Sequence, residues 1–84
     1  MDETNKRVTP QTLAEAHEEL ARIRPGRQAP LAEWFEYYQR SAALYAEIAE
    51  IDRGHHHEAL AMAERERNSA KEITAQIRGD ECGR

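Results

Sequence analysis

The most chemically loaded part of the sequence is a short polar run near its middle, Asp52-Arg53-Gly54-His55-His56-His57-Glu58. Neutral imidazoles bind metals and titrate near physiological pH. On an α-helix, residues three and four positions apart share a face, so Asp52 would lie beside His55 and His56. Ligands from one helix leave a tetrahedral metal site incomplete. The spacing predicts a hydrogen-bonded polar layer or, alternatively, a divalent-metal site of Asp52, His55 and His56.

A second dense group consists of all five aromatic residues, which lie within one stretch of twelve. They are Trp34, Phe35, Tyr37, Tyr38 and Tyr45. Tyr and Trp give a large contact area at low entropic cost and are enriched in interaction hot spots. With the aliphatic residues among and after them, they span about 200° of a helix surface, wider than one neighbouring helix covers. We expect the cluster to act both as core and as an interaction surface.

Arginines gather around residues 25–29, with Arg22, Arg24 and Arg27 in or beside that segment. Guanidinium groups bind phosphates, which suggests a nucleic-acid adaptor as a further alternative. The formal net charge of −4 argues against a general nucleic-acid binder. Ser41 and Ser69 have no base at a suitable spacing, so we expect no enzymatic activity.

The length and composition predict one small domain with few large apolar side chains for its core. The 84 residues are 33% charged, and the 39% that are hydrophobic include many alanines. No run approaches the roughly 18 apolar residues of a membrane span. The first seven residues lack the apolar stretch of a secretory signal. The single cysteine, Cys82, has no partner for an intrachain disulfide. A cytoplasmic protein without membrane partners is expected.

Capping and breaking residues divide the chain into helices. Residues 1–8 are expected to be frayed, and a first helix is expected over 10–24, capped by Thr9-Pro10 or by Thr12 with Glu15. Residues 25–29 form a linker that contains Pro25-Gly26. A second helix is predicted over 31–78, and a loose tail over 79–84 begins at Gly79.

The uncertain point in this division is Gly54, which could end a helix or be tolerated inside one at about 1 kcal/mol relative to alanine. A period of 3.6 residues extended from Trp34 reaches mostly small or apolar positions. These positions are Asp52, His56, Ala59, Ala63, Glu66, Ala70, Thr74 and Ile77. Because the 3.6-residue period continues past Gly54 without a shift, the sequence favours an uninterrupted helix. The predicted fold is all-α, a helical hairpin with a short first and a long second helix. The alternative is a compact three-helix bundle broken near Gly54.

A continuous second helix would leave the stripe from Ala59 to Ile77 uncovered, so we expect a homodimer that completes the core. A two-fold axis near Gly54 and His55 would bring both copies of the polar layer together. Acid would then weaken the dimer by charging His55 and His56.

The middle of the chain, residues 31–73, resembles small helical proteins of actinobacteria. The resemblance is carried by the stretch from Trp34 to Tyr45 and by the stretch from Ala49 to Ala59. That group has no established activity, so the resemblance implies no site residue. The function expected from the sequence is that of a small non-catalytic protein-interaction or regulatory module.

Overall fold

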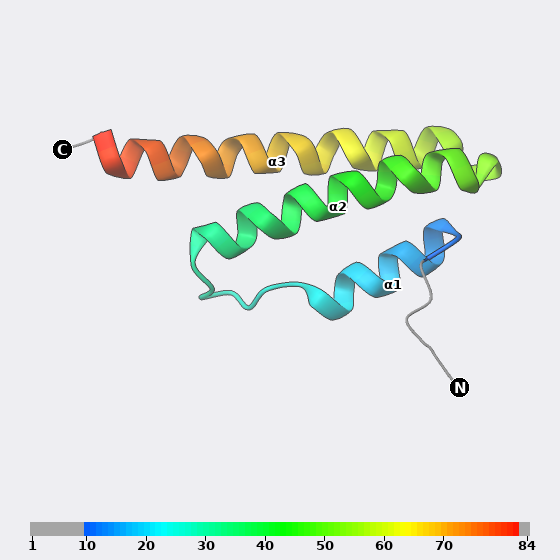
Figure 1. Ribbon diagram of the computed structural model, residues 1–84, viewed down its shortest axis with the longest axis horizontal. Helices are drawn as coiled ribbons and strands as arrows, with labels where there is room; N and C mark the ends of the chain where they lie inside the picture. The colour runs from blue at the N-terminus through cyan, green and yellow to red at the C-terminus, as the bar shows by residue number, and fades with distance from the viewer. Residues whose placement is uncertain (1–9, 83–84) are drawn as a thin grey trace.

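The computed structural model describes residues 10–82 of the chain, and within this range all regular structure is helical. Helix α1 covers Leu13–Ile23, α2 covers Leu31–Ile51 and α3 covers His56–Cys82, with one short 3-10 helix, η1, at Arg53–His55 (Figure 1). The predicted all-α class is confirmed. No helix of the described residues is long and apolar enough to cross a bilayer.

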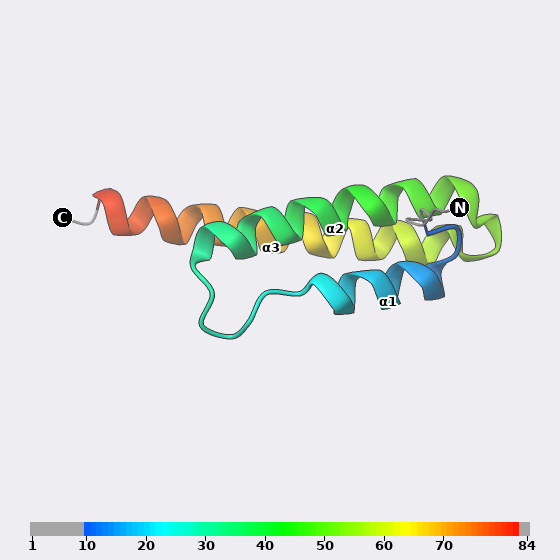
Figure 2. The same ribbon diagram turned by 60° about the horizontal axis from the view of Figure 1, so that its bottom comes forward.

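Helices α2 and α3 run antiparallel and lie side by side, and α1 lies along another side of α2 (Figures 1 and 2). The molecule is elongated and shallow, with extents of 51 × 32 × 15 Å. The carboxyl end of α3 extends beyond the start of α2 in both views. Within the described residues, α1 lies against one side of the α2–α3 pair, and no helix lies against the opposite side (Figures 1 and 2).

Helix α1 begins at the second of the two predicted caps. Thr12 has an extended backbone, and its side-chain oxygen accepts a hydrogen bond from the Glu15 N–H at 3.1 Å. The Glu15 carboxylate in turn accepts from the Gln11 N–H at 2.8 Å. These reciprocal bonds satisfy amide groups at the helix start that have no partner within the helix. The expected start at residue 10 is therefore too early, and Thr9 and residues 1–8 lie outside the described range.

The single helix expected over 31–78 is wrong, because the chain turns after Ile51. Asp52 has φ −96° and ψ 76°, outside helical geometry, and its N–H donates to Ile48 O at 2.7 Å. The 3-10 turn η1 follows, and α3 starts at His56. The break near Gly54, the alternative from the sequence, is present. Helical phase misled the prediction because a helix that folds back buries the same small residues against its own partner.

The carboxyl-terminal boundary also differs from the expectation. Helix α3 continues through Gly79 to Cys82, so residues 79–82 of the tail expected over 79–84 are helical, and residues 83–84 lie outside the described range. Gly79 has no left-handed backbone conformation of the kind that ends many helices. Without that conformation, a glycine costs helix stability but does not stop the helix. The expected linker over 25–29 is present as part of the irregular segment between α1 and α2.

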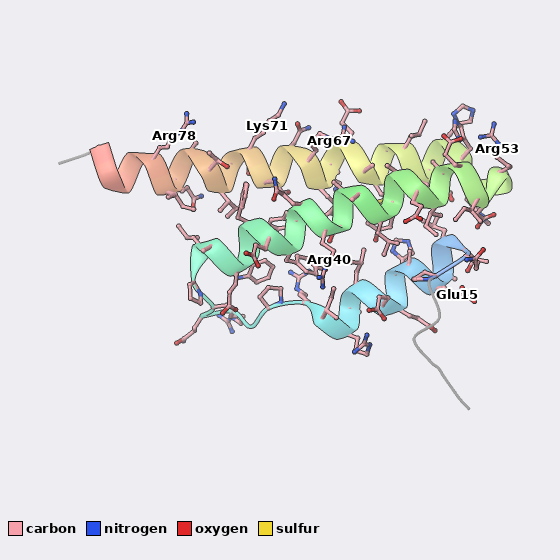
Figure 3. All side chains as sticks on the ribbon, in the orientation of Figure 1. Glu15, Arg40, Arg53, Arg67, Lys71 and Arg78 are labelled. Atoms are coloured by element: carbon pink, nitrogen blue, oxygen red, sulfur yellow. The ribbon has the colours of Figure 1, made fainter. Side chains whose placement is uncertain are left out.

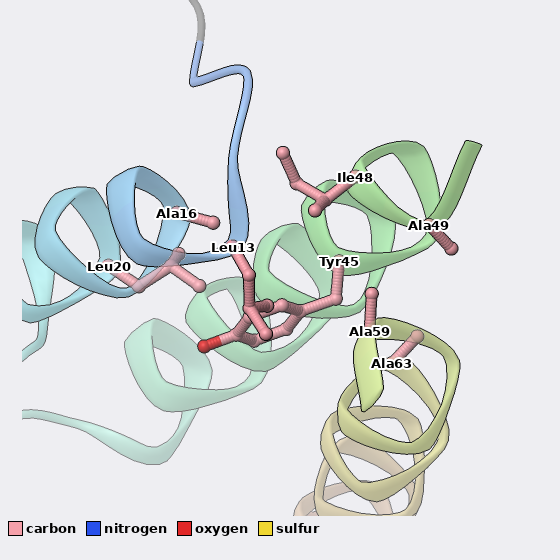
Figure 4. Packing of buried hydrophobic residues seen from close by; sticks show 8 residues of the cluster. All are labelled: Leu13, Ala16, Leu20, Tyr45, Ile48, Ala49, Ala59 and Ala63. Atoms are coloured by element: carbon pink, nitrogen blue, oxygen red, sulfur yellow. The ribbon is translucent and has the colours of Figure 1, made fainter. Parts of the chain in front are cut away.

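The core lies where all three helices meet, close to the α2–α3 turn (Figure 4). Its buried members come from each helix: Leu13, Ala16 and Leu20; Tyr45, Ile48 and Ala49; Ala59 and Ala63. The large side chains come from α1 and α2, whereas α3 contributes alanines. Small residues let α3 approach α2 closely, as its alanine-rich sequence suggests.

Candidate functional site

The aromatic cluster is divided between two sides of α2, and one member lies deep in the core. Tyr45 is only 4% exposed, and its hydroxyl forms a 2.8 Å hydrogen bond with His17 Nδ1 on α1. The two rings meet edge to face with centroids 5.5 Å apart. Burial raises the pKa of the Tyr45 hydroxyl above its usual value. Tyr45 therefore joins α1 to α2 and is closed to a partner.

Three further rings form a half-buried group on the α1 side of α2. The Trp34 ring lies 5.8 Å from that of Tyr37 and 5.6 Å from that of Tyr38. The Tyr37 hydroxyl donates to Leu20 O in α1 at 3.2 Å. The Arg24 guanidinium lies over Trp34, 5.1 Å from the ring centroid. This group attaches the end of α1 and the linker to α2, so much of its surface is used inside the chain.

The linker arginines are largely engaged within the chain. Arg22 forms an ion pair with Glu19 at 2.7 Å. Arg24 is held by its contact with Trp34. Arg27 stays exposed. A phosphate clamp needs several free guanidinium groups directed at one point. The linker does not present such a set.

Asp52 is the central residue of the predicted polar layer, and it connects the α2–α3 turn to α1. Its Oδ2 accepts from the Leu13 N–H at 3.0 Å and from His55 Nδ1 at 3.0 Å. Leu13 is the first residue of α1, where amide groups lack helical partners and the helix dipole favours a negative charge. The Leu13 hydrogen bond is the main cause that lowers the pKa of Asp52, and His55 contributes further.

The histidines of this turn point to different partners. His56 Nδ1 lies 2.8 Å from Ala49 O, and since a carbonyl only accepts, this nitrogen carries the proton. A guanidinium only donates, so the 3.4 Å approach of Arg53 to the same nitrogen is not a second hydrogen bond. The structure brings Asp52 and His55 together and directs His56 to the backbone. Among residues 10–82, no group of three or more His, Cys, Asp or Glu is placed to hold a metal ion.

An Asp52→Asn substitution is expected to lower stability at neutral pH, because it removes the charge at the start of α1. A lowered native pKa stabilises the fold above the unfolded value of about 3.9, and this contribution disappears as pH falls through the native pKa. The stability difference between native and variant chains should therefore be largest near pH 6–7 and shrink below about pH 4. Urea unfolding followed by circular dichroism measures it. A difference that is unchanged at pH 3 would contradict this role for the carboxylate.

A cleft between α1 and α3, with α2 as its floor, contains a carboxylate that sequence reasoning missed. The cleft measures about 460 Å³, and Tyr37, Tyr45 and Met62 are among its lining residues. Glu66 enters it from α3 with no hydrogen bond or ion pair to the described residues. Burial raises the pKa of Glu66, and Arg65 and Arg24 partly offset this effect. The sequence contains one signal for this residue, because Glu66 falls at a position where the 3.6-residue period predicts a buried side chain.

A Glu66→Gln substitution is expected to stabilise the protein slightly at pH 7. A raised native pKa means that the ionised carboxylate opposes folding above that pKa and ceases to do so once protonated. The gain should therefore disappear below about pH 4.5. Thermal unfolding at pH 7 and pH 4 tests this expectation. Glu64→Gln is the matched control, since Glu64 lies two residues earlier on α3 and is exposed. Equal effects at the two sites would show that Glu66 is ordinary surface charge.

The other side of the α2–α3 pair carries a groove of about 460 Å³, which we call the open face. Its lining residues are Phe35, Gln39, Ala42, Ala43 and Ala46 of α2, and Arg67, Ala70, Lys71 and Thr74 of α3. Arg67, Lys71 and Arg78 follow one another along α3 (Figure 3). Within the described range, Arg67 and Lys71 have no ion-pair partner. Phe35 alone of the five aromatics lines this groove.

Comparison with models of protein families, with curated proteins and with solved structures gives no match for this chain.

Proposed function

We propose that this protein is a small non-catalytic interaction module that binds a helical protein segment on its open face. The groove between α2 and α3 carries the proposal, because it combines an alanine-lined surface, one aromatic ring and two cations that have no ion pair within residues 10–82. The remaining aromatic residues contribute indirectly, since their contacts with α1 hold α2 in place.

The side chains of the groove define the chemistry of the bound segment. Ala42, Ala43 and Ala70 are short, so the backbone of another helix can approach closely over them. Phe35 provides an apolar anchor at the edge of these alanines. Arg67 and Lys71 lie one turn apart on α3 and favour carboxylates on the segment. The expected partner is an amphipathic helix with small apolar residues on one face and acidic residues beside them.

The hydroxyl and imidazole groups near the clefts support a non-catalytic role. Ser41 is 1% exposed, and its hydroxyl donates to Tyr37 O at 2.8 Å. His17 is engaged by the Tyr45 hydroxyl. Ser69 lines the α1–α3 cleft and has no hydrogen-bonded base among residues 10–82. Within residues 10–82, neither serine hydrogen-bonds to a base of the kind that acyl transfer usually requires.

Competitive capture with matched variants tests the proposal. The tagged chain is incubated with a second copy under a different tag and with extract of the cells that produce it. Ala43→Arg places a long charged side chain in the groove. Ala61→Arg makes the same change at an exposed position of α3 outside the groove. We expect a protein that can be identified, either the second copy or one from the extract, to bind the native chain and Ala61→Arg. Ala43→Arg should not retain that protein. Equal retention by both variants would disprove binding on the open face.

A further inference from the structure

We infer that the helix that occupies the open face is α2 of a second copy of this chain, so that two α2–α3 pairs form a four-helix dimer. This inference rests on the proposed function and specifies its partner. The segment required by the groove has small apolar residues beside carboxylates. Helix α2 has this character, with Ala42, Ala43 and Ala46 in the groove and Glu36 and Glu47 exposed near them.

The charged residues that line or border the open face differ between the two helices. The α2 residues that line the groove include no cation, and Glu36 and Glu47 each lie one to four residues from one of them. The α3 lining includes Arg67 and Lys71, and Arg78 follows seven residues after Lys71, close to the same stripe of the helix. Glu36 and Glu47 have no ion pair with the described residues. Arg40 also borders this lining, next to Gln39, and lines a second cleft together with Glu36. The α2 border therefore carries two carboxylates and one guanidinium and is net acidic, whereas the α3 lining is basic.

This difference in charge selects one of two symmetric arrangements. A two-fold axis in the interface and across the helices would place α2 on α2 and α3 on α3, with like charges facing each other. An axis parallel to the helices places α2 of each copy on α3 of the other, so that the net acidic border of α2 meets the basic lining of α3. Each helix then has antiparallel neighbours, as in ordinary four-helix bundles. Electrostatic complementarity therefore favours the parallel axis.

Rotation about an axis parallel to the helices leaves every residue at the same position along that axis. Residues at equal height on α2 of one copy and on α3 of the other therefore face each other. Glu36 lies 15 residues before Ile51, the end of α2, and Lys71 lies 15 residues after His56, the start of α3. Because both helices rise equally per residue from one turn, these two residues lie at the same height. Glu36 of each copy then faces Lys71 of the other. The axis expected near Gly54 and His55 needed an uninterrupted helix, so the histidine layer is not part of this interface.

A charge exchange in the full chain tests the inference by sedimentation equilibrium at low salt. The native chain should have a mass near twice 9.7 kDa at micromolar concentration. Lys71→Glu and Glu36→Lys should each weaken the dimer by about tenfold or more, because each change creates two like-charge contacts. The double variant should recover near-native affinity. Arg27→Glu, an equal charge change in the linker, is the control and should dimerise normally. Circular dichroism verifies that every variant is folded.

Other outcomes overturn the inference in distinguishable ways. A Lys71→Glu variant that dimerises more tightly than the native chain would indicate the opposite axis, with α3 on α3. A dimer that is indifferent to all charge changes would show that another surface associates. A monomer over the whole concentration range would exclude the second copy as occupant. In that case the Ala43→Arg and Ala61→Arg comparison against cell extract still decides separately whether the open face binds a different protein.

Discussion

Replacement of Ile48 by alanine is expected to lower the free energy of unfolding by about 2–5 kcal/mol. Ile48 is the largest fully buried side chain of the described residues, with 0% exposure, and it lies in the core cluster with Leu13 of α1 and Ala59 of α3. The loss combines the transfer free energy of the removed methylene and methyl groups with the cost of the cavity that they leave. Small domains have about 5–15 kcal/mol in total, so one substitution should remove a large share of the stability.

Ile51 provides a matched control for this prediction. It lies three residues further along α2 and is 41% exposed, so Ile51→Ala removes the same atoms without opening a cavity. Urea unfolding by circular dichroism should separate the two variants clearly. All chains should be compared at one concentration, because dimerisation would make stability depend on concentration. Similar losses at the two positions would mean that the α1–α2–α3 junction is not the stabilising core.

Replacement of Ala63 by leucine is expected to destabilise the protein by about 1–3 kcal/mol. Ala63 is 1% exposed and lies in the core cluster with Ala49 and Tyr45 of α2. A longer side chain at that point must push α3 away from α2 or take an unfavourable rotamer. The substitution also tests why α3 is rich in alanine. If close approach of the helices matters, added apolar volume should cost stability instead of increasing it.

Ala61→Leu is the control for that substitution, because Ala61 is exposed on the same helix. Leucine and alanine both favour helices, so local propensity changes little at either site. We expect Ala61→Leu to unfold close to the native chain and Ala63→Leu at clearly lower urea concentration. A stabilised Ala63→Leu protein would show that the interface between α2 and α3 has unfilled space.

Local signals in the sequence determined the helical class and the segment that separates α1 from α2. Pro25, Gly26 and Pro30 interrupt the helical pattern, and Thr12 with Glu15 satisfies the first amides of α1. These are interactions between residues close in the chain, so they can be recognised without a fold. The same holds for the periodic apolar stripe, which correctly places Tyr45 and Ile48 on a buried face of α2.

Contacts between residues far apart in the chain were decided by the tertiary structure. The carboxylate of Asp52 bonds the amide of Leu13, 39 residues away, and this contact accompanies the end of α2. In this chain the period of α2 continues without a shift into α3, where the in-phase residues Ala59, Ala63 and Ala70 are buried, so helical phase did not predict the turn. Neighbouring aromatics such as Phe35 and Trp34 diverge by about 100° around the helix, and only the positions of α1 and α3 determine which ring is covered.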